Sequence, residues 1–445
     1  MSGINHKFAA AAALLLFWAG VTRAQDGAYA SYTPYSIFGV GDILGQGSAY
    51  NGTMGGVGIA SRNHRYLNFL NPAAVTARDS LAFMVDFSIS QGNKIFRQGD
   101  MRSAVNTFTV NDCAMSFPLW EKTAMSVGIR PYRSIGYSYG YVYDDPALLG
   151  TVGNVAFSAS GQGAMYEVFS GIGVEPVKNL SLGVEGIYYF GSIEKKNYET
   201  FSDASYNGAT NGYRLKLNAA TAKFGLQYEA RIDKENVLCA GATYKLGTAL
   251  GGHVESYEFS TGTAASDTLR YKMDTLRNNP GRVKLAGELG VGIAFSHADR
   301  WRVELDYTRS DWTQTGMDTF PGFAGNSSPS ATRSSFSAAV AQTFRAGFEI
   351  VPNRNDIRYY HKKMAYRAGA YYRTEYYKID GHTINDIGIT LGATLPVFRW
   401  YNGITLGMEV GQRGMVRDNL IRERYVNFKV GVNLFDIWFQ KPRYE

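Results

Sequence analysis

Two arginines, Arg130 and Arg133, lie close together in a strand-like stretch and could bind an acid. A guanidinium group presents a planar fork of N–H donors that matches a carboxylate or phosphate. The sequence therefore offers these side chains as candidate contacts for the headgroup of an amphipathic ligand. The alternative is that such arginines pair with acidic residues on neighbouring strands, as Glu167 and Glu185 would allow.

No catalytic or metal-binding pattern accompanies these arginines. Neither nucleophile–base spacing nor metal-ligand spacing is found around the six histidines, and no Gly-Lys-Ser/Thr ending follows the glycine-rich text. We therefore expect no enzyme activity, no catalytic residues, no metal and no cofactor. The net charge of +7 is dispersed along 445 residues, so no nucleic-acid partner is expected. Cys113 and Cys239 could pair or stay free.

The first 24 residues have the layout of a signal peptide. Lys7 precedes an apolar stretch from Phe8 to Val21, and small residues, Thr22 and Ala24, occupy the −3 and −1 positions before Gln25. We therefore expect residues 1–24 to be a signal peptide and the protein to be exported. An N-terminal anchor helix is the alternative, but the stretch is short for a span.

Period-two alternation dominates the chain after about residue 80. Residues 301–308, 404–411 and 426–434 each interleave apolar side chains with glycine or charged residues, as a strand with two different faces requires. A soluble sandwich would also alternate, with its apolar face on a core. A transmembrane barrel explains better the glycine and charge on the other face and the absence of intervening helices. We therefore predict an all-β fold, a transmembrane antiparallel β-barrel over residues 80–445.

Fourteen segments fit this pattern, so we expect about 14 strands. They cover residues 81–90, 105–118, 123–139, 164–175, 180–191, 213–230, 236–250, 282–296, 301–310, 336–351, 363–377, 384–396, 403–412 and 423–436. Short connections alternate with mostly long ones such as 140–163, 192–212 and 251–281, the pattern of periplasmic turns and extracellular loops. This layout predicts the outer membrane of a Gram-negative cell, with outer-membrane lipid as a partner.

Aromatic residues gather toward the segment ends, where ring systems with a polar tip suit the lipid headgroup level. A stacking platform for sugar or nucleic acid is the alternative. The interfacial candidates are Tyr137, Tyr139, Tyr141, Tyr143, Tyr188, Tyr189, Phe190, Tyr371, Tyr372, Tyr376, Tyr377, Trp400, Tyr401, Trp438 and Phe439.

Residues 25–79 do not alternate and are rich in glycine and apolar side chains. A barrel of fourteen strands would leak if it were empty. We therefore expect this segment to fold into the lumen as a plug, or hatch. A flexible periplasmic tail is the alternative, although the apolar content is high for a solvated tail.

Two motifs in this segment resemble a known family. Met54, Gly55 and Gly56 begin the run Met-Gly-Gly-Val-Gly-Ile-Ala, and the element Asn71-Pro72-Ala73 stands just before the first strand. Together with the opening Tyr35–Asp42 and the closing Trp438–Tyr444, they resemble the FadL/TodX family of outer-membrane transporters for hydrophobic compounds, and most of all its Bacteroidota branch. The loops and the chain end do not match the fatty-acid transporters.

The resemblance implies capture of a hydrophobic small-molecule ligand, passage past a displaceable hatch, and exit through a lateral opening at a kink in the third strand. Pro131 is the candidate for that kink because proline cannot donate to the strand ladder. The alternative is a simple bulge that reorients the strand. A second function also stays open, that of a non-transporting subunit of an outer-membrane assembly or protein-secretion complex.

Overall fold

The structure is a computed structural model that describes residues 30–45, 47–79, 81–143, 153–203, 205–261, 270–276, 283–324, 335–397, 402–416 and 420–437. The predicted signal peptide and the aromatic run from Trp438 lie outside the described residues, as do Trp400 and Tyr401. None of the described helices has the length and apolar character needed to cross a membrane.

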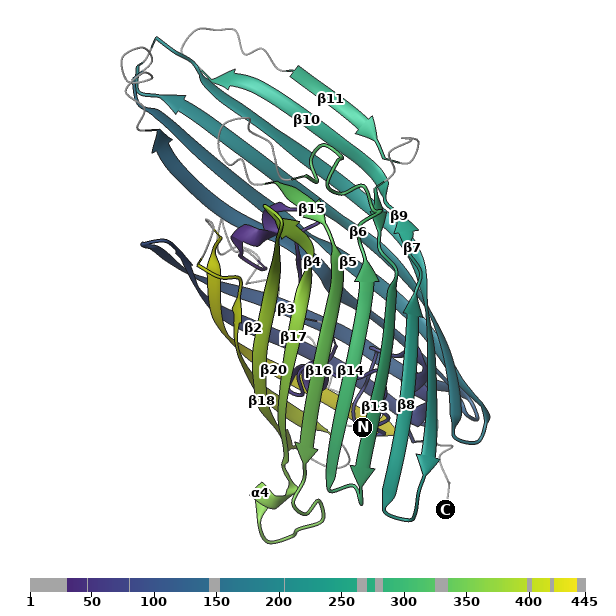
Figure 1. Ribbon diagram of the computed structural model, residues 1–445. Helices are drawn as coiled ribbons and strands as arrows, with labels where there is room; N and C mark the ends of the chain where they lie inside the picture. The colour runs from purple at the N-terminus through teal and green to yellow at the C-terminus, as the bar shows by residue number, and fades with distance from the viewer. Residues whose placement is uncertain are drawn as a thin grey trace, which may run out of the picture.

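Fourteen antiparallel strands of the described chain form one closed barrel (Figure 1). In order around the barrel they are β2 (Ala82–Gln98), β3 (Met101–Trp120), β4 (Thr123–Tyr143), β5 (Val155–Val177), β6 (Leu180–Phe201), β7 (Gly208–Arg231), β8 (Asn236–Lys245), β13 (Glu288–His297), β14 (Trp301–Asp311), β16 (Val340–Ile350), β17 (Ala365–Ile379), β18 (His382–Pro396), β19 (Gly403–Arg413) and β20 (Arg422–Ile437). The barrel closes where β20 pairs with β2. The predicted count of about 14 is confirmed, and each predicted segment overlaps one of these strands.

Alternation divides each strand into a lumen face and an outer face. On β6, Val184 and Tyr188 are half-exposed on the outer face, while Glu185 and Ile187 are buried toward the lumen. The outer positions of this strand are apolar up to Phe190 and polar from Ser192 onward. The apolar part forms the band expected to contact lipid. We refer to the end where β2 begins and β20 ends as the periplasmic end, in keeping with its mostly short turns.

Strands β4 to β7 continue well beyond this band at the opposite, extracellular end. The upper half of β7 leaves β8 and pairs instead with β10 (Gly251–Thr261), which pairs in turn with β11 (Arg270–Thr275). Figure 1 shows these strands rising above the rest of the wall. The predicted loops 140–163, 192–212 and 251–281 are therefore wrong in large part. On β6 the sequence signal fails because the outer positions from Ser192 onward are mostly polar.

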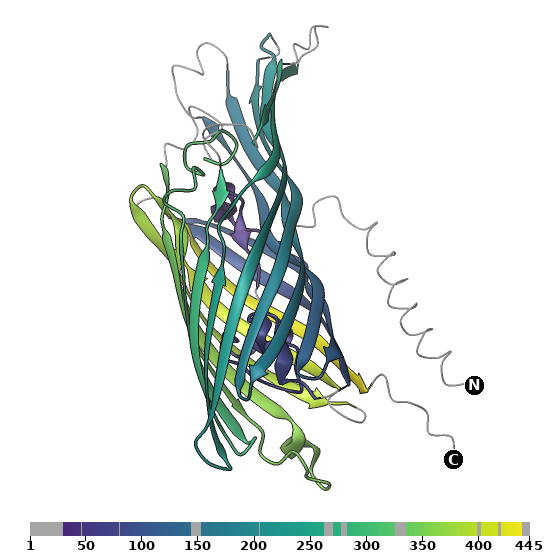
Figure 2. The same cartoon turned by 90° about the vertical axis from the view of Figure 1, so that its right-hand side faces the viewer.

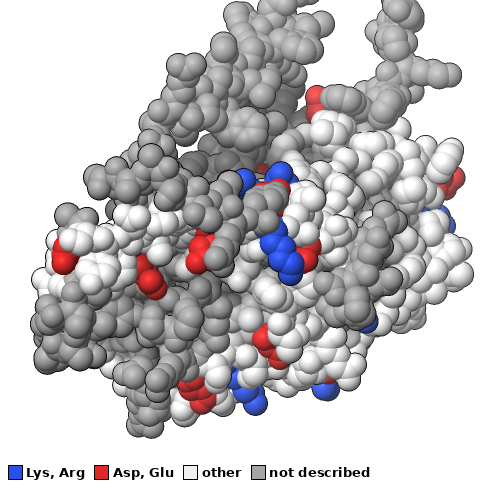
Figure 3. Space-filling model, turned by 90° about the horizontal axis from the view of Figure 1, so that it is seen from above, with Lys and Arg blue, Asp and Glu red and all other residues white. Residues whose placement is uncertain are grey.

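Several smaller elements complete the described chain. β15 (Phe336–Ala338) extends β16 against β17, and β9 (Thr248–Ala249) pairs with β12 (Lys284–Leu285) as a separate ribbon. α4 (Tyr360–Lys363) lies in the connection from β16 to β17 at the periplasmic end. Seen from above, acidic and basic side chains are interspersed over the extracellular end, without a field of one sign (Figure 3).

The prediction of aromatic girdles is wrong for part of the set. Tyr137, Tyr189, Tyr376 and Tyr377 are buried in the interior. Tyr188, Phe190 and Tyr372 do lie on the outer face. Counting along the strand distinguishes these cases, because neighbouring residues point to opposite faces and only alternate aromatics can reach the lipid.

The segment before the barrel runs through its interior. It contains η1 (Pro34–Ile37), β1 (Asp42–Ile43), α2 (Ala49–Gly52) and η2 (Pro72–Ala77). Its contacts pass from β4, across the inner faces of β14 to β18, to the periplasmic ends of β5 to β7. Figure 2 shows these elements enclosed by the strands.

Candidate functional site

The wall of the barrel changes its pairing where β3 and β4 meet. These strands pair only between Cys113–Trp120 and Thr123–Ile129, near the periplasmic end. Above Ile129, β4 remains paired with β5 along its whole length, and β3 remains paired with β2. The backbone edge of β4 from Tyr132 to Ser138 therefore faces away from β5 and needs other partners. We call this stretch of β4 the β4 edge.

Residues 32–44 of the N-terminal segment supply those partners. β1 pairs with the β4 edge, with Asp42 opposite Ser134 and Ile43 opposite Arg133. Thr33 N donates to Gly136 O over 2.8 Å. The Tyr32 hydroxyl donates to Ser138 O over 2.7 Å and stands 3.1 Å from Ser138 N, which donates to it. The segment thus occupies the place along β4 that β3 leaves.

Gly41 shows how closely the segment approaches β4. Its φ is +93°, and a Cβ there would overlap the carbonyl group of Ser134. Only glycine accepts both the left-handed backbone and the close contact. Gly41 O accepts from Arg133 Nη1 at 3.1 Å and from the Tyr376 hydroxyl at 2.9 Å.

The two predicted headgroup arginines have different surroundings. Arg133 is buried, with its guanidinium carbon 4.4 Å from the ring centre of Tyr376 and 4.7 Å from that of Trp312. Arg130 forms a buried salt bridge with Glu167 and lies 5.0 Å from the ring centre of Phe69. Arg130 therefore belongs to an ion pair, whereas the polar partner of Arg133 is a carbonyl group of the N-terminal segment.

Pro131 lies where β4 changes direction. The register of β4 against β5 shifts between Pro131 and Arg133, which leaves Tyr132 as a bulged residue that is buried in the interior. This bulge follows Ile129, the last residue of β4 that pairs with β3. The bulge and the parting of the two strands thus coincide at the proline.

Met54, Gly55 and Gly56 lie against the lumen face of the opposite wall. Gly55 N donates to Thr390 Oγ1 over 2.8 Å, and Gly55 and Gly56 have φ values of +72° and +81°. A Cβ on Gly55 would stand 2.8 Å from Ala346 O, so this turn of the segment fits directly on the strand backbone. Met54 is fully buried beside it.

The element Asn71-Pro72-Ala73 docks on three glycines of the wall, Gly173, Gly183 and Gly225. Asn71 caps η2 by accepting from Ala73 N, and its amide donates to Ile59 O over 2.7 Å. A Cβ on any of the three wall glycines would meet residues of η2 or its cap. The glycines of β5 to β7 therefore make room for this element.

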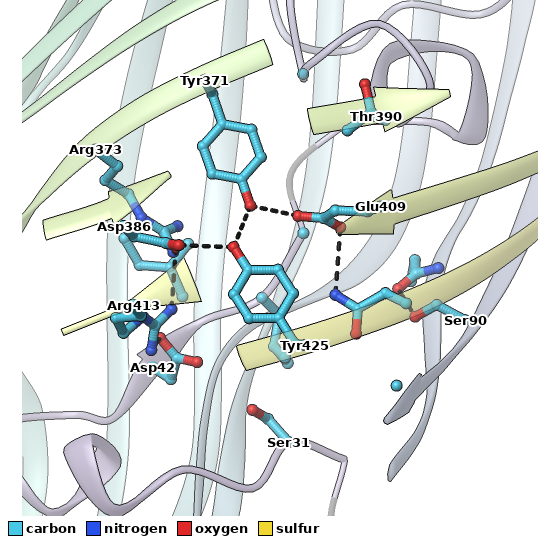
Figure 4. Close-up of a pocket in the computed structure, with 18 of the residues that line it drawn as sticks. Ser31, Asp42, Ser90, Tyr371, Arg373, Asp386, Thr390, Glu409, Arg413 and Tyr425 are labelled. Carbon is cyan, nitrogen blue, oxygen red and sulfur yellow. Dashed lines mark hydrogen bonds and ion pairs between the residues drawn. The ribbon is translucent and has the colours of Figure 1, made fainter. Parts of the chain in front are cut away.

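A polar cavity of about 200 Å³ lies in the lumen between the N-terminal segment and the strands around the closure of the barrel (Figure 4). The Tyr371 hydroxyl donates to Glu409 over 2.5 Å and contacts the Tyr425 hydroxyl at 2.6 Å, and the latter donates to Asp386 over 2.6 Å. Arg413 joins the cavity to the N-terminal segment through an ion pair with Asp42 at 2.9 Å.

Charges of both signs line this cavity in equal number. The acids are Asp42, Glu288, Asp386, Glu409 and Glu423, and the bases are Lys94, Arg345, Arg373, Arg413 and Lys429. Such a lining suits water or the polar part of an amphipathic molecule better than a bare hydrocarbon. The ion pairs Arg130–Glu167 and Arg367–Glu349 also join opposite charges on neighbouring strands, as the alternative of paired charges predicts.

A large apolar cluster lies toward the extracellular end of the barrel. It joins Phe38 and Val40 of the N-terminal segment with Trp312, Phe320 and Phe323 of the connection from β14 to β15. The buried ammonium of Lys195 links the same two parts. It donates to Ile37 O over 2.8 Å and to Gly322 O over 2.8 Å.

Sequence reasoning did not single out Asp42, Tyr425 or Arg413 as site residues. Their strand periodicity places Arg413 and Tyr425 in the lumen, but only the register of neighbouring strands brings them together. Cys113 and Cys239 are both free. Within the described ranges, no group of three or more His, Cys, Asp or Glu side chains is arranged to hold a metal ion.

Comparison with known proteins gives the family. The model of the BamG family matches residues 6–445. The chain belongs to the BamG family. No curated protein matches it.

Solved structures of similar fold include hydrocarbon channels. The toluene transporter TodX of Pseudomonas putida has a TM-score of 0.60 and 14% identity, and the match covers 90% of this chain and 100% of that one. The CymD monoaromatic hydrocarbon channel has a TM-score of 0.57 and 11% identity over 88% of this chain and 98% of that one. A FadL homologue of Pseudomonas aeruginosa has a TM-score of 0.54 and 10% identity over 89% and 100%. The FadL/TodX fold that the sequence motifs predicted is therefore confirmed for this BamG family member.

Proposed function

We propose that this BamG family protein is an outer-membrane channel for hydrophobic or amphipathic small molecules, and that residues 30–45 hold it closed. The observation that carries the proposal is the β4 edge, whose partners from Tyr132 to Ser138 come from the N-terminal segment. When the segment moves away from this edge, the lumen opens sideways into the lipid between β3 and β4. An apolar molecule could then leave without crossing the polar periplasmic end.

The chemistry of the β4 edge favours an amphipathic cargo with an acidic headgroup. Arg133 donates to Gly41 O in the closed state, so it loses this hydrogen bond when the segment leaves. A carboxylate can then take the place of the carbonyl group, with a stronger, charge-assisted hydrogen bond. Arg130 keeps Glu167 as its partner, and its guanidinium group packs on the ring of Phe169. The proposal assigns the protein no catalysis.

Replacement of Pro131 by alanine tests the lateral route. Alanine restores a backbone N–H, which allows the pairing of β3 with β4 to extend upward. We expect uptake of an apolar fluorescent fatty acid by cells to slow severalfold, with the amount of folded barrel unchanged. Pro176→Ala is the matched control, because Pro176 also lies at a register shift, on β5 near the periplasmic turn. Equal uptake in both variants would contradict a lateral exit at Pro131.

A second function is favoured by a separate observation: the lumen is filled both at its extracellular end and at the level of the polar cavity. The apolar cluster fills its extracellular end, and the paired charges leave a cavity of only about 200 Å³. A barrel that never opens would serve as a non-transporting subunit of an outer-membrane assembly or secretion complex. Absence of uptake by the unmodified protein, together with stoichiometric co-purification of another outer-membrane protein, would favour this function over transport.

A further inference from the structure

The connection from β16 to β17 differs from the other described turns at the periplasmic end. It runs from Val351 to Met364, whereas β3 and β4 are joined by two residues and β13 and β14 by three. It is also internally fixed. Asn353 N donates to Lys362 O over 2.9 Å, and Asp356 accepts from Tyr359 N over 2.6 Å. A connection of this length usually has a function beyond joining two strands.

The connection forms one wall of a basic groove at the periplasmic mouth. The groove has a volume of about 530 Å³, and Arg65, Arg300, Arg354 and Lys363 line it. The one acidic side chain in its lining, Asp299, already forms an ion pair with Arg65 at 2.9 Å. The excess of positive charge within the groove therefore has room for an acid from outside.

The placement of Arg354 supports the same conclusion. Its side chain is about three-quarters buried, it donates to Asp299 O over 3.0 Å, and it stands 3.7 Å from Glu349. Burial, followed by the like charge of Arg65, lowers the pKa of Arg354. An anion between these two guanidinium groups would relieve their repulsion.

The groove opens toward the barrel axis. Its lining includes Tyr66 of the N-terminal segment and Thr394, a lumen-facing residue of β18 that accepts from buried Arg367. A lipid headgroup of the surrounding leaflet would have to cross the strand ends to enter it. A chain that approaches from the periplasm has direct access.

The same connection exposes apolar and aromatic groups outside the lining of the groove. Ile357 is 98% exposed at the tip of the connection, and Tyr359 and Tyr360 are both partly exposed. Lys362 Nζ lies 4.7 Å from the ring centre of Tyr359. Aromatic, apolar and cationic groups together are typical of protein-binding surfaces.

We propose that this periplasmic groove is a docking site for an acidic segment of a periplasmic protein. The acidic side chains of the partner enter between Arg65, Arg354 and Lys363, and its apolar residues contact Ile357 and Tyr359. Because Arg65 belongs to the N-terminal segment, the partner contacts the segment that occupies the lumen. The site goes beyond the proposed transport function and does not depend on it.

The test uses the full-length protein in nanodiscs and a fluorescein-labelled peptide that alternates glutamate with leucine. We expect saturable binding by fluorescence anisotropy and a loss of about tenfold in affinity, or more, in the double variant Arg354→Gln/Lys363→Gln. The matched control is Lys178→Gln/Lys234→Gln, which removes two cations from other turns at the same end. Heat-modifiable migration on gels verifies that each variant is folded.

Three outcomes would overturn the proposal. Equal affinity in the groove variant and the unmodified protein would show that the peptide binds elsewhere. An equal loss in the control variant would show attraction to net charge alone. Competition by vesicles of phosphatidylglycerol, lost in the groove variant and stronger than that of the peptide, would assign the groove to lipid.

Discussion

Replacement of Arg413 by methionine is expected to cost about 3–5 kcal/mol of unfolding free energy, the usual cost of removing one partner from a buried ion pair. Arg413 is 4% exposed in its side chain and stands 2.9 Å from Asp42, 3.3 Å from Glu375 and 3.6 Å from Asp386. Its removal leaves Asp42 buried without this cation, while Glu375 and Asp386 keep Arg373 as a shared cation. Urea unfolding of the barrel in liposomes measures the effect.

Two further variants serve as comparisons for the loss of stability in Arg413→Met. Arg424→Met on β20 removes an exposed arginine that donates only to Gln412 in the described structure, so we expect a change below about 1 kcal/mol. Adding Asp42→Asn to Arg413→Met should recover part of the loss, because the carboxylate that Arg413 leaves behind disappears with it. Equal stability of the Arg413 and Arg424 variants would show that the lumen is well hydrated and the network contributes little.

Deletion of residues 25–79 is expected to convert a silent barrel into a conducting one. The fourteen strands pair with one another without this segment, while the segment occupies the lumen from the β4 edge to the periplasmic end. A barrel of this width without a plug leaves an aqueous passage. Planar-bilayer recording should show stepwise openings that the unmodified protein lacks. Unchanged conductance of the folded deletion variant would contradict a plug.

A milder variant covers the case in which the deleted barrel does not assemble. Gly55→Val places a branched side chain at φ +72° against the backbone of β16, so it pushes the segment off the wall without removing it. We expect intermittent openings of intermediate size. Gly45→Ala is the matched control, because a Cβ there meets only the Lys429 ammonium at 3.6 Å. Identical traces from both glycine variants would show that the Gly55 contact does not seal the lumen.

The barrel could be predicted from the sequence because lipid imposes a strict pattern. Strands such as β18 and β19 alternate apolar and glycine or polar residues along their length, and their predicted ends fall close to the observed ones. Outside the lipid this constraint disappears. β10 carries His253 and Glu255 on the same face as Tyr257 and Phe259, so it lacks the regular apolar alternation of the lipid-facing strands.

The site was only partly predictable. Pro131, Gly55 and Asn71 carry local backbone chemistry that is visible in the sequence, and the structure brings each into contact with the wall or the bulge. The pairing of Asp42 with Arg413 joins residues about 370 positions apart, and it depends on where the N-terminal segment lies. Arg133 was predicted as a headgroup residue, but its carbonyl partner on Gly41 depends on the same placement.

A reversible disulfide between β1 and β4 tests whether contact of the N-terminal segment with the β4 edge keeps the channel closed. Asp42 and Ser134 are paired across antiparallel strands, a geometry with Cα atoms close enough for a disulfide. In a background with Cys113 and Cys239 replaced by serine, Asp42→Cys/Ser134→Cys would lock the segment on the β4 edge when oxidised. We expect uptake of the fluorescent fatty acid to stop on oxidation and to return on reduction, and uptake by the Asp42→Cys single variant to be insensitive to redox state. Undiminished uptake by the fully oxidised protein would contradict this expectation.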